Sequence, residues 1–114
     1  MAKWDEELTF SVLTLQARRK LLFALAKGGP QTGADLMQAG RGRGTCKKRS
    51  HFLDSTLKNL KLMVKAGIVV QLENPDDRRR PLYALEPGLK VTVEGDEIVI
   101  DFVFCVARML EDGN

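Results

Sequence analysis

Three consecutive arginines, Arg78, Arg79 and Arg80, are the residues whose types and spacing most clearly indicate a binding chemistry in this sequence. They follow turn-forming residues at 74–77 and precede Pro81, so we expect them at the tip of a β-hairpin. Guanidinium groups bind phosphate oxygens through several N–H donors at once. Contacts to phosphates or to a DNA groove explain the three arginines better than packing does, and a solvated turn is the alternative.

A second group of polar side chains follows from the periodicity of residues 50–66, which predicts a long helix. Leu53, Leu57, Leu60 and Val64 recur at steps of four, three and four residues, so we expect them on the buried face. The opposite face and its margins carry the side chains that could reach bases or phosphates, namely His51, Asp54, Ser55, Lys58, Asn59 and Lys61.

Cations are concentrated in the middle of the chain. Residues 41–80 contain eleven Lys and Arg against four Asp and Glu, a local charge of +7, whereas the remaining residues sum to −4. The basic loop expected at 40–49 contains Lys47, Lys48 and Arg49, which could hold phosphates at the start of the following helix. A basic centre between acidic ends indicates a polyanionic partner, and a solvated charged face is the alternative.

Catalysis and metal binding find little support in the residue types. The 114 residues include one histidine, His51, and two cysteines, Cys46 and Cys105, without the spacing of a metal site or a disulfide framework. No phosphate-binding loop with Lys-Ser/Thr and no nucleophile motif is present in the sequence. We therefore expect no enzyme activity, no cofactor and no metal, and for both thiols we favour an unreactive role over a redox switch.

Two helices are expected before the basic region. Asp5 is suited to cap the first one, whose inner face would carry Leu8, Val12 and Leu13. The second is predicted over residues 15–27, with Leu15 among its core positions, and the Gly-Gly-Pro sequence that follows should end it.

A third, short helix is expected to start at Thr32, with Asp35 three residues later, and to end near Gly40. Beyond the long helix, residues 68–72 and 81–85 have the composition of two strands joined by a turn. Pro81 indicates an edge position for the second of these strands, because proline cannot donate to a sheet ladder.

A second hairpin is predicted from residues 91–94 and 97–100, which flank a Gly-Asp turn. The apolar tail at 101–110 fits either a strand or a helix. The order of these elements predicts an α+β fold, specifically a winged helix-turn-helix that is mainly helical, with a β-hairpin wing and a second C-terminal hairpin. We expect a single domain over residues 1–114, with its core at 8–85 and a hairpin and dimerisation tail at 86–114.

Three segments resemble one protein family. The sequence NLKLMVKAGIV at 59–69 resembles the "HLKLLREAGLV" signature of ArsR-like winged-helix regulators. The sequence RRRPLYAL at 78–85 is similar to the family's arginine-rich wing with its "YRL" end. The sequence LQARRKLLFAL at 15–25 is similar to the family's "DPTRRRILELL" helix.

This resemblance implies a homodimer that binds a pseudo-palindromic operator in double-stranded DNA and represses transcription. The helix at 50–66 would lie in the major groove, with the wing at 73–81 on the adjacent backbone or minor groove. Metal-sensing members carry cysteines before the recognition helix or His/Asp pairs in a C-terminal helix, and this sequence lacks both. The candidate dimer contacts are Trp4, Leu8, Phe102, Phe104 and Val106.

Two other functions remain open at this point. A winged helix can act as a protein-interaction module that does not bind DNA, although the local charge of +7 would then require an acidic partner. RNA binding is less favoured because few aromatic side chains are available for base stacking. Neither a signal peptide nor an apolar stretch of transmembrane length is recognisable, so we expect a cytoplasmic protein without a membrane partner.

Overall fold

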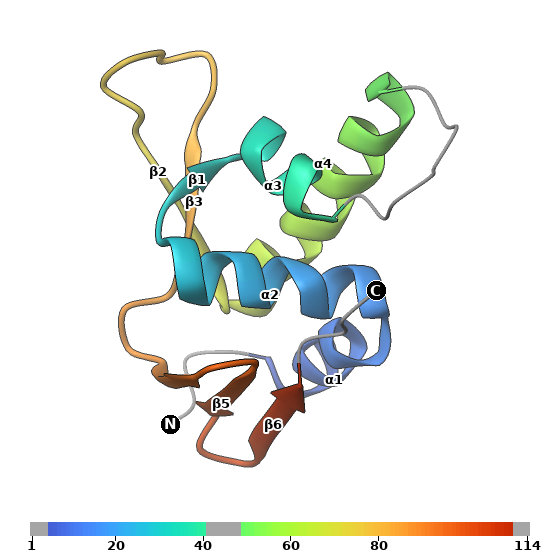
Figure 1. The fold of residues 1–114 in the computed structure, drawn as a ribbon, viewed down its shortest axis with the longest axis vertical. Coiled ribbons are helices and arrows are strands. Elements are labelled where there is room, and N and C mark those ends of the chain that lie inside the picture. The colour runs from blue at the N-terminus through green and yellow to red at the C-terminus, as the bar shows by residue number, and fades with distance from the viewer. Residues whose placement is uncertain (1–4, 41–48, 111–114) are drawn as a thin grey trace.

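The computed structural model describes residues 5–40 and 49–110, with side chains placed for residues 5–38 and 53–110. The chain has an α+β fold in which the helices come first and two small antiparallel sheets follow (Figure 1). The helices are α1 (Glu6–Thr14), α2 (Gln16–Gly28), α3 (Gly33–Gly40) and α4 (Arg49–Ala66). Within these ranges, no helix is both long enough and apolar enough to cross a membrane.

The first two helices have the expected ends. The side chain of Asp5 caps α1 by accepting a hydrogen bond from the backbone N–H of Leu8 at 2.9 Å. Val12 is fully buried, whereas Leu8 and Leu13 are half-buried against the core. The prediction that Leu15 faces the core is wrong, since this residue is 48% exposed. Leu15 is the extended residue between α1 and α2, so it does not share the buried face of α2.

The start of α3 is confirmed as a reciprocal cap. The backbone N–H of Asp35 donates to the Thr32 hydroxyl at 3.2 Å, and the backbone N–H of Thr32 lies 3.4 Å from an Asp35 carboxylate oxygen. A short strand, β1 (Gln31–Thr32), directly precedes this helix and was not predicted. Two residues are too few to produce a recognisable period of two, so the sequence gives no signal for β1.

The long helix α4 exists as predicted, but its buried face is rotated from the expected one. Leu60 and Met63 are fully buried and Thr56 is nearly so, whereas Leu57 is 37% exposed. The helix packs against α1, α3 and β2 together, and these contacts select the stripe through Leu60 and Met63 as its inner face. The placement of Leu57 on the buried face was therefore wrong.

The first sheet contains β1, β2 (Val69–Leu72) and β3 (Leu82–Leu85) in the order β1-β3-β2. The hairpin of β2 and β3 is confirmed, with Gln71 opposite Tyr83. The prediction of an edge position for the second strand is wrong, because β3 pairs with β1 on one side and with β2 on the other. Pro81 lies one residue before β3, so its missing N–H does not interrupt the ladder.

The second sheet is a meander of β4 (Lys90–Glu94), β5 (Glu97–Asp101) and β6 (Val106–Leu110). The predicted hairpin is β4 and β5, and the apolar tail proves to be a turn followed by a third strand rather than a helix. Ile98, Ile100 and Phe102 are fully buried and join the helices in one continuous hydrophobic core.

Candidate nucleic-acid interface

The loop between β2 and β3 and the first turns of α4 project at one end of the molecule (Figure 1). The second sheet lies at the opposite end, beneath α2 and beside α1. The wing, defined here as residues 73–81, and α4 also line one hollow together, to which the wing contributes Arg79 and Arg80. This end contains the wing arginines Arg78, Arg79 and Arg80, which are among the residues predicted to bind phosphates.

The wing has a fixed turn at its base. Asn74 is almost completely buried, and its side-chain N–H donates to the carbonyl of Arg80 at 3.0 Å while its Oδ1 accepts from the backbone N–H of Asp76 at 3.0 Å. The carboxylate of Asp77 accepts from the backbone N–H of Arg79 at 3.0 Å, and the Arg80 N–H donates to the Asp77 carbonyl. These side-chain-to-backbone bonds hold the arginine backbone in place.

The three wing arginines extend into solvent and face the wing's own acidic side chains. Arg78 Nε lies 3.8 Å from Glu73, and the Nε atoms of Arg79 and Arg80 lie 3.9 and 3.7 Å from Asp77. With Asp76 included, residues 73–80 carry three cations and three anions. Exposed ion pairs of this length contribute little stability, about 0–1 kcal/mol each, so a phosphate can replace the carboxylates.

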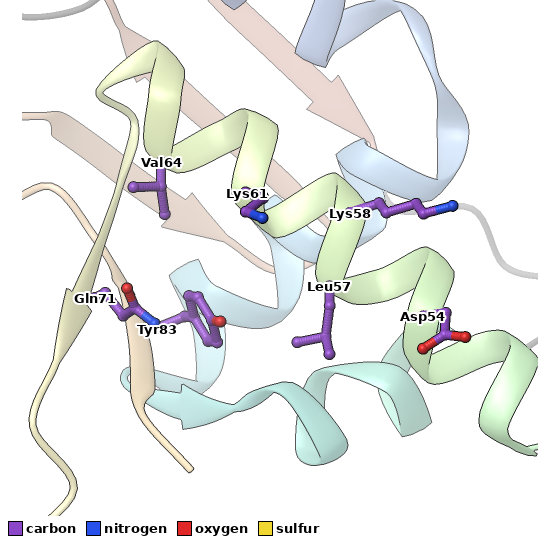
Figure 2. A pocket seen from close by; sticks show the side chains of 7 residues that line it. All are labelled: Asp54, Leu57, Lys58, Lys61, Val64, Gln71 and Tyr83. Atoms are coloured by element: carbon purple, nitrogen blue, oxygen red, sulfur yellow. The ribbon is translucent and has the colours of Figure 1, made fainter. Parts of the chain in front are cut away.

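The exposed face of α4 contains Asp54, Ser55, Lys58 and Lys61, as the sequence predicted. Figure 2 shows the side chain of Lys58 directed away from Tyr83, toward the outside of the helix. The cationic and hydrogen-bonding groups of these four residues are available to a partner along this face.

Asn59 has a different environment from the other predicted contacts. It is half-buried, and its Oδ1 accepts a hydrogen bond from Arg18 Nε at 3.0 Å. Arg18 also donates to the carbonyl of Ser11 at 2.9 Å, so it connects α1, α2 and α4. Sequence reasoning missed Arg18, because a contact between residues 41 positions apart leaves no periodic signal. The carbonyl of the Asn59 side chain is therefore engaged within the chain, and this contact helps to orient α4.

Two hollows adjoin α4 and share Leu57 and Tyr83. The first has a volume of about 410 Å³ and lies between α4 and the strands β2 and β3 (Figure 2). The second, of about 510 Å³, is bounded by α3, α4 and the wing residues Arg79 and Arg80. Gly33 makes room here, because a Cβ atom at its position would come within 2.8 Å of a Leu57 methyl group.

Several predicted contacts fall outside the described part of the chain. Lys47, Lys48 and Trp4 are among the residues that are not described, as is most of the predicted basic loop at 40–49. Arg49 and His51 belong to α4, but their side chains are outside the described set. In the ranges that the structure does describe, no three His, Cys, Asp or Glu side chains form a group that could hold a metal ion.

The predicted dimer contacts divide into two kinds. Val106 is 63% exposed, and Leu8 and Phe104 are half-buried, so each of these has surface that a second chain could reach. Phe102 is fully buried within its own chain, where it stacks against Phe104 at a ring-centroid distance of 6.3 Å. This geometry therefore supports a core position for Phe102 and not a dimer contact.

Comparisons with models of known protein families, with curated proteins and with solved structures gave no match for this chain. The resemblance to ArsR-like regulators thus rests on the three sequence segments alone and stays a prediction.

Proposed function

We propose that this protein is a winged helix-turn-helix regulator that binds double-stranded DNA and represses transcription. The observation that carries the proposal is that the wing and the first turns of α4 project at one end of the molecule (Figure 1). The described residues of α4 expose Lys58 and Lys61, and the wing exposes its three arginines. The acidic second sheet lies at the other end, where it does not oppose the approach of DNA.

The order of elements supports this proposal. A winged helix-turn-helix needs a short helix that braces a recognition helix, followed by a hairpin that reaches the neighbouring DNA backbone. Here α3 packs against α4, and the hairpin of β2 and β3 follows directly. The strand β1 pairs with β3 and so fixes the base of the hairpin to the start of α3.

In the proposed complex, α4 enters the major groove, which is about 12 Å wide and admits one helix. Lys58 and Lys61 contact phosphates or base acceptors, and Ser55 and Asp54 lie on the same exposed face. A carboxylate such as that of Asp54 accepts a hydrogen bond from the cytosine amino group, so it would favour particular bases. The wing arginines exchange Glu73 and Asp77 for the phosphates or minor groove beside the helix.

A titration at several salt concentrations tests the proposal. Fluorescence anisotropy with the promoter of the protein's own gene, and with duplexes selected from a random pool, should reveal a preferred sequence. The variant R78A/R79A/R80A should bind at least tenfold more weakly. Its salt dependence should be shallower by about 0.9 log units for each phosphate that the variant no longer neutralises.

The matched control removes three exposed cations elsewhere, at Lys27, Lys90 and Arg108. This control should change affinity and salt dependence much less than the wing variant does. A wild-type protein that binds no duplex at any salt concentration would overturn the proposal. Equal losses in the two triple variants would exclude the wing as a specific contact.

We also propose that the protein acts as a homodimer in the cytoplasm, where it has access to DNA. Val106 and Leu110 are exposed on β6, an edge strand of the second sheet, and they supply apolar surface for self-association. Light scattering should give twice the chain mass, and V106D should reduce it toward that of the monomer. A wild-type monomer at high concentration would refute the dimer.

The balanced charge of the wing favours a second candidate function. Three acidic residues accompany the three arginines at 73–80, and such a mixed surface also suits a protein partner. In this alternative the winged helix is a protein-interaction module that does not bind DNA. Binding of a defined partner in pull-downs, together with no affinity for any duplex, would support it over the first.

A further inference from the structure

The hollow bounded by α3, α4 and the wing has the size and lining of a small-molecule site. Its volume of about 510 Å³ falls in the range of roughly 300–1,000 Å³ that is typical of ligand pockets. Met37, Leu53 and Leu57 form apolar walls, whereas Arg79 and Arg80 contribute the positive charge. A mostly apolar cavity with a few convergent polar groups is the usual form of an organic-ligand site.

Tyr83 provides an independent indication of a ligand. The residue is only 9% exposed and lines this hollow, and its hydroxyl makes no hydrogen bond to any other described residue. The hydroxyl of a tyrosine whose side chain is this deeply buried usually has a hydrogen-bond partner. Figure 2 shows the ring extending from β3 toward Leu57, which lies in the wall of both hollows. The hydroxyl is thus available to a group inside the site.

The arginines are also available. The Nε atoms of Arg79 and Arg80 lie 3.9 and 3.7 Å from Asp77, which is beyond hydrogen-bond distance. A carboxylate placed in the hollow could accept two parallel N–H bonds from one guanidinium, which is a stronger arrangement than these loose pairs.

We propose that this hollow binds a small aromatic carboxylate. The flat apolar ring system would lie between Met37, Leu53 and Leu57, and the carboxylate would pair with Arg80 or Arg79. The hydroxyl of Tyr83 would donate a hydrogen bond to the same ligand. Two arginines at the rim favour an anion over a neutral or cationic molecule of the same shape.

The site would regulate the protein, and this part of the inference rests on the proposed DNA binding. Arg79 and Arg80 belong both to the hollow and to the proposed DNA-contacting wing. A bound carboxylate engages the guanidinium groups that would otherwise contact phosphates. Ligand and DNA therefore compete, and by linkage each weakens the binding of the other by the same factor.

The first experiment measures ligand binding in the absence of DNA. Calorimetry with 2-naphthoate as the probe, and with 2-naphthamide as its uncharged analogue, should give binding of the acid and at least tenfold weaker binding of the amide. Tyr83 is the single tyrosine in the chain, so protein labelled with ¹³C-tyrosine should give one set of ring signals, which shift on addition of 2-naphthoate.

Variants locate the site. Y83F should weaken 2-naphthoate binding by roughly tenfold, because it removes a hydrogen bond to a charged group, yet it should not lower the melting temperature of the free protein. R80A should weaken 2-naphthoate binding to a similar extent. R78A is the matched wing control, since Arg78 does not line the hollow, and it should change this affinity less than twofold.

The outcomes separate this inference from the proposed function. No 2-naphthoate binding, or equal binding by Y83F, R80A and wild type, overturns the site and leaves DNA binding intact as a proposal. Binding of 2-naphthoate that does not weaken the protein–DNA complex overturns the regulatory role. Binding of 2-naphthoate by a protein that binds no duplex supports the site while the proposed function fails.

Discussion

The helical part of the molecule, residues 6–85, and the second sheet, residues 90–110, contribute to one hydrophobic core but present opposite charges to solvent. The exposed groups of α4 include Lys58, Lys61 and Lys65, and the wing adds three arginines. Residues 90–110 carry four acids against two cations, a net charge of −2. Because the core joins the two parts, the fold holds a cationic end and an acidic end in fixed positions. We therefore expect a polyanion to approach the end formed by α4 and the wing.

The largest change in the free energy of unfolding is expected from a substitution in the second sheet. This substitution tests whether the sheet is needed for stability. Phe102 is fully buried, so F102A should lower the free energy of unfolding by about 3–5 kcal/mol. E94A, at an exposed position of the same sheet, is the control and should change it by less than about 0.5 kcal/mol. Urea denaturation measures both. Similar values for the two variants would mean that the sheet is only loosely attached to the helices.

The next effect concerns the contact that joins α1, α2 and α4. R18A removes the hydrogen bonds to Asn59 and to the Ser11 carbonyl, and we expect stability to fall by about 1–3 kcal/mol. N59A should lower the stability by less. A double-mutant cycle, measured by denaturation, should give a coupling energy of about 1 kcal/mol between the two residues. Strict additivity of the two substitutions would contradict the assignment of Asn59 to orienting α4.

A smaller effect is expected at the start of α3. T32A removes the hydroxyl that caps Asp35 and should destabilise the protein by about 1 kcal/mol. T32S keeps the hydroxyl and should restore most of this stability in thermal unfolding. If T32S were as destabilised as T32A, the methyl group of Thr32 rather than its cap would be responsible.

The smallest effect is a pH dependence from the second sheet. Burial, with smaller contributions from the charges of Glu6 and Asp101, raises the pKa of the Cys105 thiol in the folded protein. The folded state therefore favours the neutral thiol. Its contribution to stability is complete below the pKa of an unfolded thiol and is lost as pH rises through the higher folded value. In urea denaturation at a series of alkaline pH values, the free energy of unfolding of wild type should fall more steeply with pH than that of C105A. Parallel pH dependences of the two proteins would contradict this.

The sequence predicted the helices and their caps better than it predicted how these helices pack together. Caps at Asp5 and Thr32 and the periodicity of α4 are local signals, and the structure confirms them. The rotation of α4 that exposes Leu57 depends on three neighbouring elements at once, so a single helical period could not reveal it. Pairing of β1 with β3 likewise depends on residues about 50 positions apart.

The candidate site was predicted by residue type but not by geometry. The exposed positions of Arg78–Arg80 and Lys58 follow from the sequence, because turns and helix faces are local. The pairing of the arginines with Glu73 and Asp77 was not predicted, although these acids lie beside them in the sequence as well. Nothing local indicated that Tyr83 would reach Leu57, since that proximity arises when the sheet meets α4.

The continuous core has a consequence for how the chain can be divided. Ile98, Ile100 and Phe102 are buried with helix residues such as Leu21 and Leu22 in a single cluster. A fragment that stopped after Glu86 would leave the helices with uncovered apolar surface, and such surface promotes aggregation. We therefore expect the first 86 residues to fold poorly on their own. Fusion partners belong at the chain ends, because a cut between the sheets would divide one folding unit.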